Sequence, residues 1–137
     1  MIPAHPRVLL ASAADTIGEA AVVEWCCRLI TDTENVDDPD VALLGGTEDW
    51  LPYWRRTWGA RGLLYVWSDA PHVVEALAVA LTDEHWRVRE MACKVIRARR
   101  VEQVDPLLAP LVDDTNARVR SAAHRALVAI GGLPFRR

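Results

Sequence analysis

The chain has 137 residues, of which 51% are hydrophobic and 26% charged, with a formal net charge of −3. A chain of this length is expected to form a single domain, 1–137, and to bury enough surface to fold without disulfides or a metal. No apolar run approaches the roughly 20 residues that cross a bilayer, and no secretory signal is recognisable. Three cysteines, of which Cys26 and Cys27 are adjacent, are typical of a reducing compartment. We therefore expect a cytoplasmic protein without a membrane anchor or cofactor.

The charge is unevenly distributed along the chain. Residues 1–84 carry 5 basic and 14 acidic side chains, a net charge of −9, whereas residues 85–137 carry 11 and 5, a net charge of +6. Such an asymmetry can steer a partner or drive head-to-tail contacts. We nevertheless favour ordinary solvated helix faces whose charge varies by chance along the chain.

The N-terminal part predicts two helices. Residues 7–14 have a helical pattern, and Thr16 followed by Glu19 is typical of a capping box that opens a helix to Ile30. Residues 32–49 then hold seven acidic side chains and no Lys or Arg. This segment lacks the mid-loop glycine and terminal glutamate of an EF-hand, so we expect a mobile, solvated loop with one short turn ending at Leu44, and no metal.

The remainder of the chain predicts helices separated by short turns and no strand pair. Proline stands in the first turn of several of these segments, where its missing N–H is not needed, and Gly131-Gly132 ends the last one. The expected helices are 51–67, 71–81, 84–99, 105–112 and 116–130.

An internal repeat with an offset of 31 residues is the strongest pattern in the sequence. Asp83, Val88-Arg89 and Ala92 recur as Asp114, Val119-Arg120 and Ala123. Repeats of this length are typical of stacked helical hairpins, none of which can bury its apolar face alone.

An earlier copy, at an offset of 32, is degenerate. Trp54-Arg55 matches Trp86-Arg87, but Thr57 stands where the arginine is expected and Leu51 where the aspartate is expected.

These repeated residues resemble HEAT-like repeats, and in particular the short type found in phycobilin lyases. The resemblance implies an all-α protein with an α-α superhelix, a right-handed solenoid of about three helical hairpins with an extra N-terminal helix. It also implies a concave surface lined by the second helix of each hairpin. The expected organisation is a divergent segment 1–49, followed by the repeat-related ranges 50–81, 82–112 and 113–131.

We interpret the repeated Asp83, Arg89, Asp114 and Arg120 as structural residues. The carboxylates can accept hydrogen bonds from the turns, and the arginines can bridge to them between layers.

Candidate binding residues lie on the helix faces that the resemblance places in the concave surface. Trp50, Trp54, Trp58, Arg61 and Tyr65 would form an aromatic ridge on one helix, which Trp86 would extend. Alternatively, residues 1–31 fold over this ridge and bury it, in which case we expect Trp54 and Trp58 to stay partly exposed. Basic residues continue the surface, with Arg55, Arg87 and Arg118 at equivalent positions of a basic ladder. The full set of candidates is Trp54, Trp58, Arg61, Tyr65, Trp86, Arg87, Lys94, Arg97, Arg118 and Arg125.

No nucleotide-binding, metalloprotease or nucleophile motif occurs, so we expect no enzymatic activity. The sequence favours a module that binds a protein or peptide. Alternatives are a nucleic-acid-binding protein or a relic of the DNA glycosylases built from HEAT-like repeats, with Glu90 beside Trp86 as the nearest analogue of their carboxylate. A self-assembling subunit is a third possibility, in which Leu133-Pro134-Phe135 would fold back or meet another copy.

Overall fold

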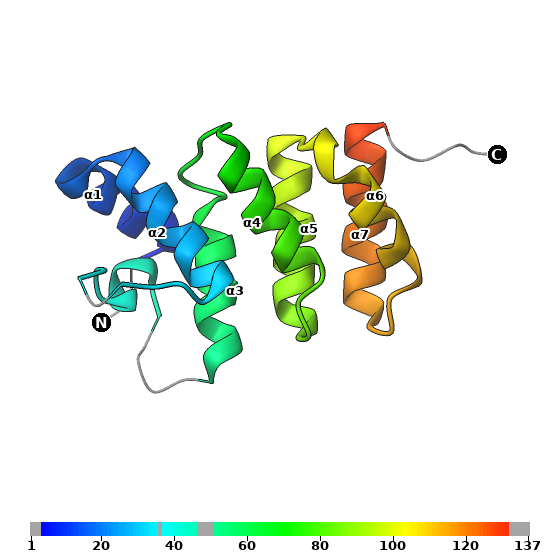
Figure 1. Ribbon diagram of the computed structural model, residues 1–137, viewed down its shortest axis with the longest axis horizontal. Coiled ribbons are helices and arrows are strands. Elements are labelled where there is room, and N and C mark those ends of the chain that lie inside the picture. The colour runs from blue at the N-terminus through cyan, green and yellow to red at the C-terminus, as the bar shows by residue number, and fades with distance from the viewer. Residues whose placement is uncertain (1–3, 36, 47–50, 132–137) are drawn as a thin grey trace.

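The computed structural model describes residues 4–35, 37–46 and 51–131, which form seven α-helices, three short 3-10 helices and no strand. The helices stack in two layers, as Figure 1 shows. In the first layer, α2 packs on α4 and α4 contacts α6; in the second, α3 packs on α5 and α5 on α7. The fold is therefore an all-α helical solenoid. Its first layer comprises α2 (Glu19–Thr31), α4 (Pro71–Leu81) and α6 (Asp105–Leu108), and its second comprises α3 (Pro52–Gly62), α5 (Trp86–Arg99) and α7 (Ala117–Ile130).

Each second-layer helix pairs with the first-layer helix that precedes it in the chain. Helix α2 packs on α3, α4 packs on α5, and α6 with η3 (Ala109–Asp113) packs on α7. The hairpins are thus α2–α3, α4–α5 and α6–α7. Each copy recognised in the sequence therefore begins at the second helix of a hairpin, not at its first. One continuous core of buried side chains extends from Leu10 to Leu127.

Helix α1 (Pro6–Ile17) is the extra N-terminal helix, and it packs on α2 and on η1 (Val41–Leu44). The helix predicted over 7–14 is confirmed, but the capping box at Thr16 is wrong. Gly18, with φ +95°, separates α1 from α2, and the Thr16 hydroxyl donates back to the Ser12 carbonyl at 2.9 Å. Glu19 instead accepts a hydrogen bond from the Trp67 main-chain N–H at 3.1 Å.

The acidic segment is not the free loop that its composition predicts, at least where the structure describes it. Asp38 accepts a hydrogen bond from Arg28 Nε at 3.0 Å, and Asp40 caps η1 through the Ala42 N–H at 2.8 Å. Val41 and Leu44 are fully buried. These contacts attach the segment to α2 and to the core. Residues 36 and 47–49 of the expected loop lie outside the described residues.

Helix α3 ends at Gly62, earlier than the predicted Trp67. Residues 63–65 turn more tightly through hydrogen bonds to residues three positions earlier, and Arg99 Nε donates to the Leu63 carbonyl at 3.0 Å. The helix also approaches α2 closely, because a Cβ at Gly59 would lie 2.7 Å from the Cys26 carbonyl oxygen.

The helix predicted over 105–112 is also interrupted. Helix α6 ends at Leu108, and η3 continues it. Pro110 has no N–H to donate to the carbonyl four residues earlier, so it interrupts the α-helical hydrogen bonds, and it stands in the first turn of η3. The helices predicted over 71–81, 84–99 and 116–130 agree with α4, α5 and α7 within two residues.

Candidate functional site

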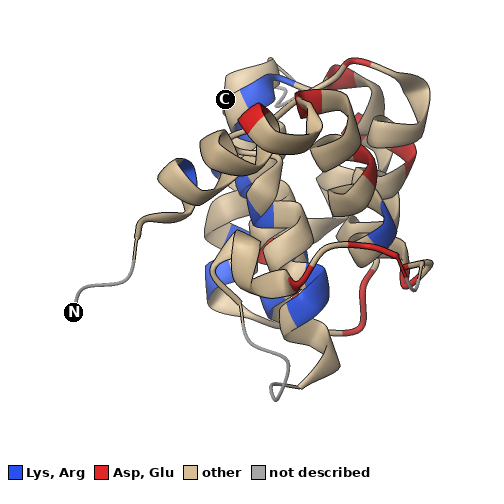
Figure 2. Cartoon of the chain, turned by 90° about the vertical axis from the view of Figure 1, so that its left-hand side faces the viewer, with Lys and Arg blue, Asp and Glu red and all other residues tan. Residues whose placement is uncertain are grey.

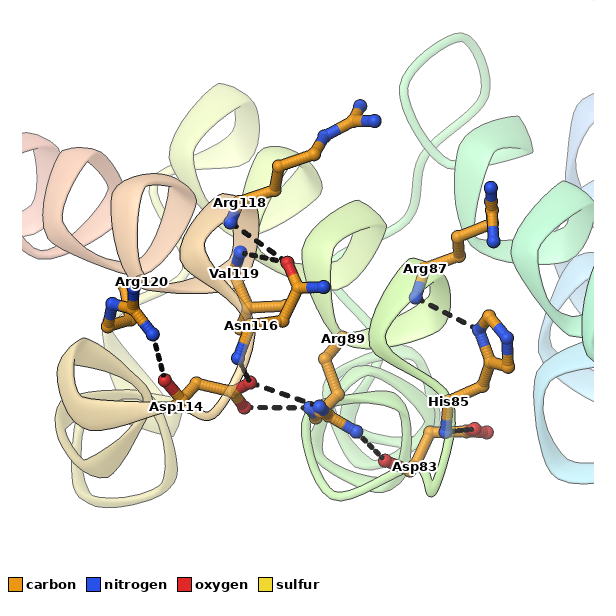
Figure 3. Close-up of polar contacts among 9 residues, drawn as sticks. All are labelled: Asp83, His85, Arg87, Arg89, Asp114, Asn116, Arg118, Val119 and Arg120. Atoms are coloured by element: carbon orange, nitrogen blue, oxygen red, sulfur yellow. Dashed lines mark hydrogen bonds and ion pairs between the residues drawn. The ribbon is translucent and has the colours of Figure 1, made fainter.

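Aspartate–arginine pairs join successive hairpins of the stack. Figure 3 shows one of these pairs, between Asp114 and Arg89. Asp114 Oδ1 accepts from the Asn116 N–H at 2.9 Å, which fixes its own turn, and both carboxylate oxygens accept from Arg89 of the preceding hairpin at 2.8 and 3.0 Å. Burial raises the pKa of Asp114, but the hydrogen bonds from Arg89 and the Asn116 N–H outweigh this effect and leave the pKa below its ordinary value. Both carboxylate oxygens therefore have a structural role.

The same pairing occurs one hairpin earlier with a shifted partner. Asp83 accepts from Arg56 Nε and Nη2 at 2.7 and 3.2 Å. The repeat offset places the arginine at position 57, which is a threonine. Arg56, one position earlier, supplies the contact instead. The last arginine of the series, Arg120, donates to the Asp114 main-chain carbonyl at 2.7 Å, as Arg89 does to that of Asp83 at 2.8 Å.

Aromatic and cationic side chains meet where α3 and α5 begin. The guanidinium of Arg87 lies 4.3 Å from the ring centre of Trp86 and 5.1 Å from that of Trp54, and Arg118 lies 5.2 Å from Trp86. The rings of Tyr53 and His85 stack, with their centres 3.6 Å apart. His85 also caps α5 by accepting from the Arg87 N–H at 3.2 Å, and desolvation lowers its pKa. The cation–π contacts restrict both arginines.

Three adjoining hollows form a groove along α3, α5 and α7. A hollow of about 420 Å³ lies between α5 and α7, a second of about 340 Å³ continues it past Arg97 and Arg125, and a third of about 240 Å³ extends it to Trp54 and Trp86. We call this continuous surface the α3/α5/α7 groove. The largest hollow is lined by Glu90, Lys94, Arg97, Arg118, Ser121, Ala122 and Arg125.

Glu90 lies at the centre of the groove and is 9% exposed. Its carboxylate accepts from Arg118 Nε at 3.1 Å and lies 3.6 Å from Lys94 Nζ. The ion pair with Lys94 is the one expected from their spacing of four residues, whereas the pair with Arg118 links two hairpins. The buried carboxylate is thus neutralised by two cations.

Seven of the ten candidate binding residues line this groove: Trp54, Trp86, Arg87, Lys94, Arg97, Arg118 and Arg125. Met91, Ser121 and Ala122 are among the lining residues that sequence reasoning missed. The repeat offset relates two of them to the preceding copy, because Ser121 and Ala122 occupy the positions of Glu90 and Met91 one copy later.

The predicted aromatic ridge on α3 is wrong beyond Trp54, because the N-terminal segment covers it. Trp58 is only 6% exposed, against the expectation that it stays partly exposed, and its ring packs directly on Gly46. Arg61 donates to the Leu44 carbonyl at 2.6 Å, and burial lowers its pKa. Tyr65 meets His5 edge to face at 5.8 Å. Trp50 lies outside the described residues.

The expected basic ladder is also incomplete. Arg87 and Arg118 line the groove, but Arg55 forms an ion pair with Glu34 of the acidic segment. Figure 2, which faces the left-hand side of Figure 1, shows both acidic and basic segments at this end of the molecule.

A metal site needs several ligands close together, and a reactive thiol needs a lowered pKa. No cluster of three or more potential metal ligands occurs among the described residues. Desolvation raises the pKa of Cys27 and of Cys93 to about 12 and raises that of Cys26 further, so these buried thiols are protonated at neutral pH. Among the described residues, no helix has the length and hydropathy that spanning a membrane requires.

A family profile described as HEAT repeats matches residues 56–134, which is more than half of the chain. No curated protein and no solved structure matches.

Proposed function

Because the chain belongs to the HEAT-repeat family, we propose that it is a non-enzymatic interaction module that binds a segment of a protein or peptide partner along the α3/α5/α7 groove. HEAT repeats commonly mediate protein interactions, which supports this class of function. The observation that carries the proposal is the concentration of partly exposed cationic and aromatic side chains in one hollowed surface between hairpins.

The lining of the groove favours an acidic segment. Lys94 and Arg118 are 48% and 64% exposed, and Glu90 is the single carboxylate in the lining of the largest hollow. Tryptophan and arginine are the residues that contribute most to protein-binding hot spots. An extended acidic segment with an apolar side chain near Trp54 and Met91 complements this surface.

Nucleic acid is the second candidate, and the basic lining is the observation that favours it. Sequence-tolerant binding of single strands depends on aromatic faces that are free to stack on bases. Arg87 already lies over Trp54 and Trp86, which leaves these rings less accessible to a base. Glu90 is held by Arg118 and Lys94, so a glycosylase-like role for it is not supported.

Leu133-Pro134-Phe135, which self-assembly would use, lie outside the described residues. Self-assembly through the outer side of α7 receives little support from the residues there. Arg89 of α5 is paired and Cys93 is fully buried. The equivalent residues of α7, Arg120 and His124, are both exposed. Polar side chains of this kind typically cover the terminal layer of a helical stack. We place the module in the cytoplasm, because its three buried cysteines are free thiols, as is typical of a reducing compartment.

A peptide selection tests the proposal on the full chain. Peptides selected from a random display library are expected to bind wild type and to lose binding in the double variant Arg97→Glu/Arg125→Glu. The control variant Arg7→Glu, on exposed α1, should keep binding. Selected peptides that bind all three proteins equally would contradict the proposal. Steeply salt-dependent binding of oligonucleotides, with no peptide binding, would support the second candidate instead.

A further inference from the structure

Two arginines in the groove have no acidic partner. Arg97 of α5 and Arg125 of α7 both line the hollow of about 420 Å³ and its continuation of about 340 Å³. Within the described part of the chain, no ion pair or side-chain hydrogen bond joins either of them to another residue, whereas Arg118 and Lys94 share Glu90. Two uncommitted guanidinium groups therefore reach the same hollow from two different hairpins.

The charge of the hollow is unbalanced. Its lining carries four cations (Lys94, Arg97, Arg118, Arg125) and one carboxylate (Glu90), so four minus one leaves a net charge of +3. Glu90 is 9% exposed and engaged by two of these cations. The excess positive charge is therefore carried mainly by Arg97 and Arg125. Such a concave cluster raises the local concentration of anions.

We infer that this hollow is a subsite for a phosphate group on the bound segment, held by Arg97 and Arg125. The inference rests on the proposed function, namely that a peptide lies in the groove. A phosphorylated side chain carries a charge near −2 and three acceptor oxygens. A guanidinium donates two parallel N–H groups to such an anion, so one phosphate group can engage both arginines. An aspartate or glutamate side chain carries a single negative charge, which balances the charge of only one arginine.

The surroundings of the hollow fit one concentrated charge better than an extended polyanion. A nucleic-acid backbone presents singly charged phosphates at regular spacing and needs cations all along its path. The path along the groove passes Glu90, and the third hollow beyond it is lined by Trp54, Trp86 and Met91 as well as by cations. Ser121 lines the hollow beside the arginines and adds a neutral hydroxyl donor.

Binding of matched peptide pools to the full chain tests the inference. One pool has a central phosphoserine with degenerate flanking residues, and the other has serine at that position. A sequence retained by the immobilised protein is then synthesised in both forms, and its dissociation constants are measured by fluorescence anisotropy. We expect the phosphorylated form to bind at least about tenfold more tightly. Arg97→Gln and Arg125→Gln should each remove most of this preference, and Arg7→Gln should leave it unchanged.

The outcomes separate this inference from the proposed function. Peptides that need the groove but bind equally with and without phosphate would overturn the phosphate subsite and leave the peptide-binding module intact. Absence of any groove-dependent peptide binding would overturn both. Inorganic phosphate at millimolar concentration is expected to compete with the phosphopeptide. Oligonucleotides that depend on Arg97 and Arg125, with no binding of the phosphopeptide, would assign the subsite to nucleic acid and overturn the inference. Circular dichroism checks that every variant is folded.

Discussion

Arg89 connects two successive hairpins by donating to both carboxylate oxygens of Asp114, at 2.8 and 3.0 Å. The side chains of Arg89 and Asp114 are 14% and 6% exposed. Removal of one member of a shielded pair leaves the other charge without compensation, and this costs more than the pair contributes to stability. The contact therefore makes the second and third hairpins depend on each other.

The first prediction concerns this contact. Asp114→Ala should lower the free energy of unfolding by about 3 kcal/mol, because Arg89 loses its partner and the turn loses its cap. Urea denaturation followed by circular dichroism measures the change. Asp113→Ala is the matched control, since Asp113 is exposed and should change stability by less than about 0.5 kcal/mol. Equal effects of the two substitutions would show that the Arg89–Asp114 contact does not couple the hairpins.

The second prediction is a pH dependence that arises from Asp38. The hydrogen bond from Arg28 lowers the pKa of Asp38 in the folded protein, although burial acts in the opposite direction. Because the unfolded chain then binds a proton more readily, this contact stabilises the fold above the ordinary aspartate pKa of about 4, and its contribution is lost as pH falls through the lower, folded value.

Urea unfolding midpoints measured from pH 7 down to pH 3 check this expectation. Asp38→Asn should lower the midpoint at pH 7 and should make the remaining decline toward acid shallower than in wild type. Asp37→Asn, at an exposed neighbouring position, serves as the control. An identical pH profile for wild type and Asp38→Asn would show that the Arg28–Asp38 pair does not contribute to acid sensitivity.

Sequence patterns predicted the second and third hairpins well because their residues repeat at a constant offset. The offset of 31 places Arg87, Glu90 and Lys94 of α5 at positions equivalent to Arg118, Ser121 and Arg125 of α7. These six residues line the groove. Periodicity within a helix is a local property, so the residues that share a face follow directly from their spacing.

The N-terminal half was predicted less well because its contacts are not local. Burial of Trp58 depends on Gly46, and that of Arg61 on the carbonyl of Leu44, contacts that no helical period encodes. The partner of Asp83 was missed for a related reason. Arg56 lies one position away from the repeat register, and only the packing of α3 on α5 shows that its guanidinium reaches the turn.

The third prediction concerns the closeness of α2 and α3. In an exposed helix, Gly→Ala is stabilising by about 1 kcal/mol. At Gly59 the added Cβ would lie 2.7 Å from both the Cys26 carbonyl oxygen and the Leu29 Cβ, so the two helices would have to separate. Overpacking of this kind lowers the free energy of unfolding by about 1–3 kcal/mol. The Cys26 carbonyl belongs to the main chain of α2, so it cannot move aside as a flexible side chain would. We therefore expect Gly59→Ala to lower the midpoint of urea unfolding.

A second substitution calibrates the helix-propensity part of that result. Ala98→Gly, at an exposed position of α5, should cost about 1 kcal/mol without any change in packing. If Gly59→Ala instead raised the midpoint by a similar amount, α2 and α3 would have room for the methyl group, and the close approach would be disproved.

The fourth prediction concerns the thiols. Cys26, Cys27 and Cys93 are buried, and desolvation raises the pKa of Cys27 and Cys93 to about 12. Since the thiolate is the reactive form, none of the three should react with a disulfide reagent at pH 8 while the protein is folded, and all three should react within minutes in concentrated urea. The absorbance of the released thiolate dye measures both rates. Reaction of the folded protein then requires opening of the hairpins. The rate for Cys93 should therefore rise in Asp114→Ala, because Cys93 is a buried residue of α5, the helix that packs on α7 of the third hairpin. A rapid reaction of wild type in the absence of urea would show that at least one of these thiols is accessible without opening.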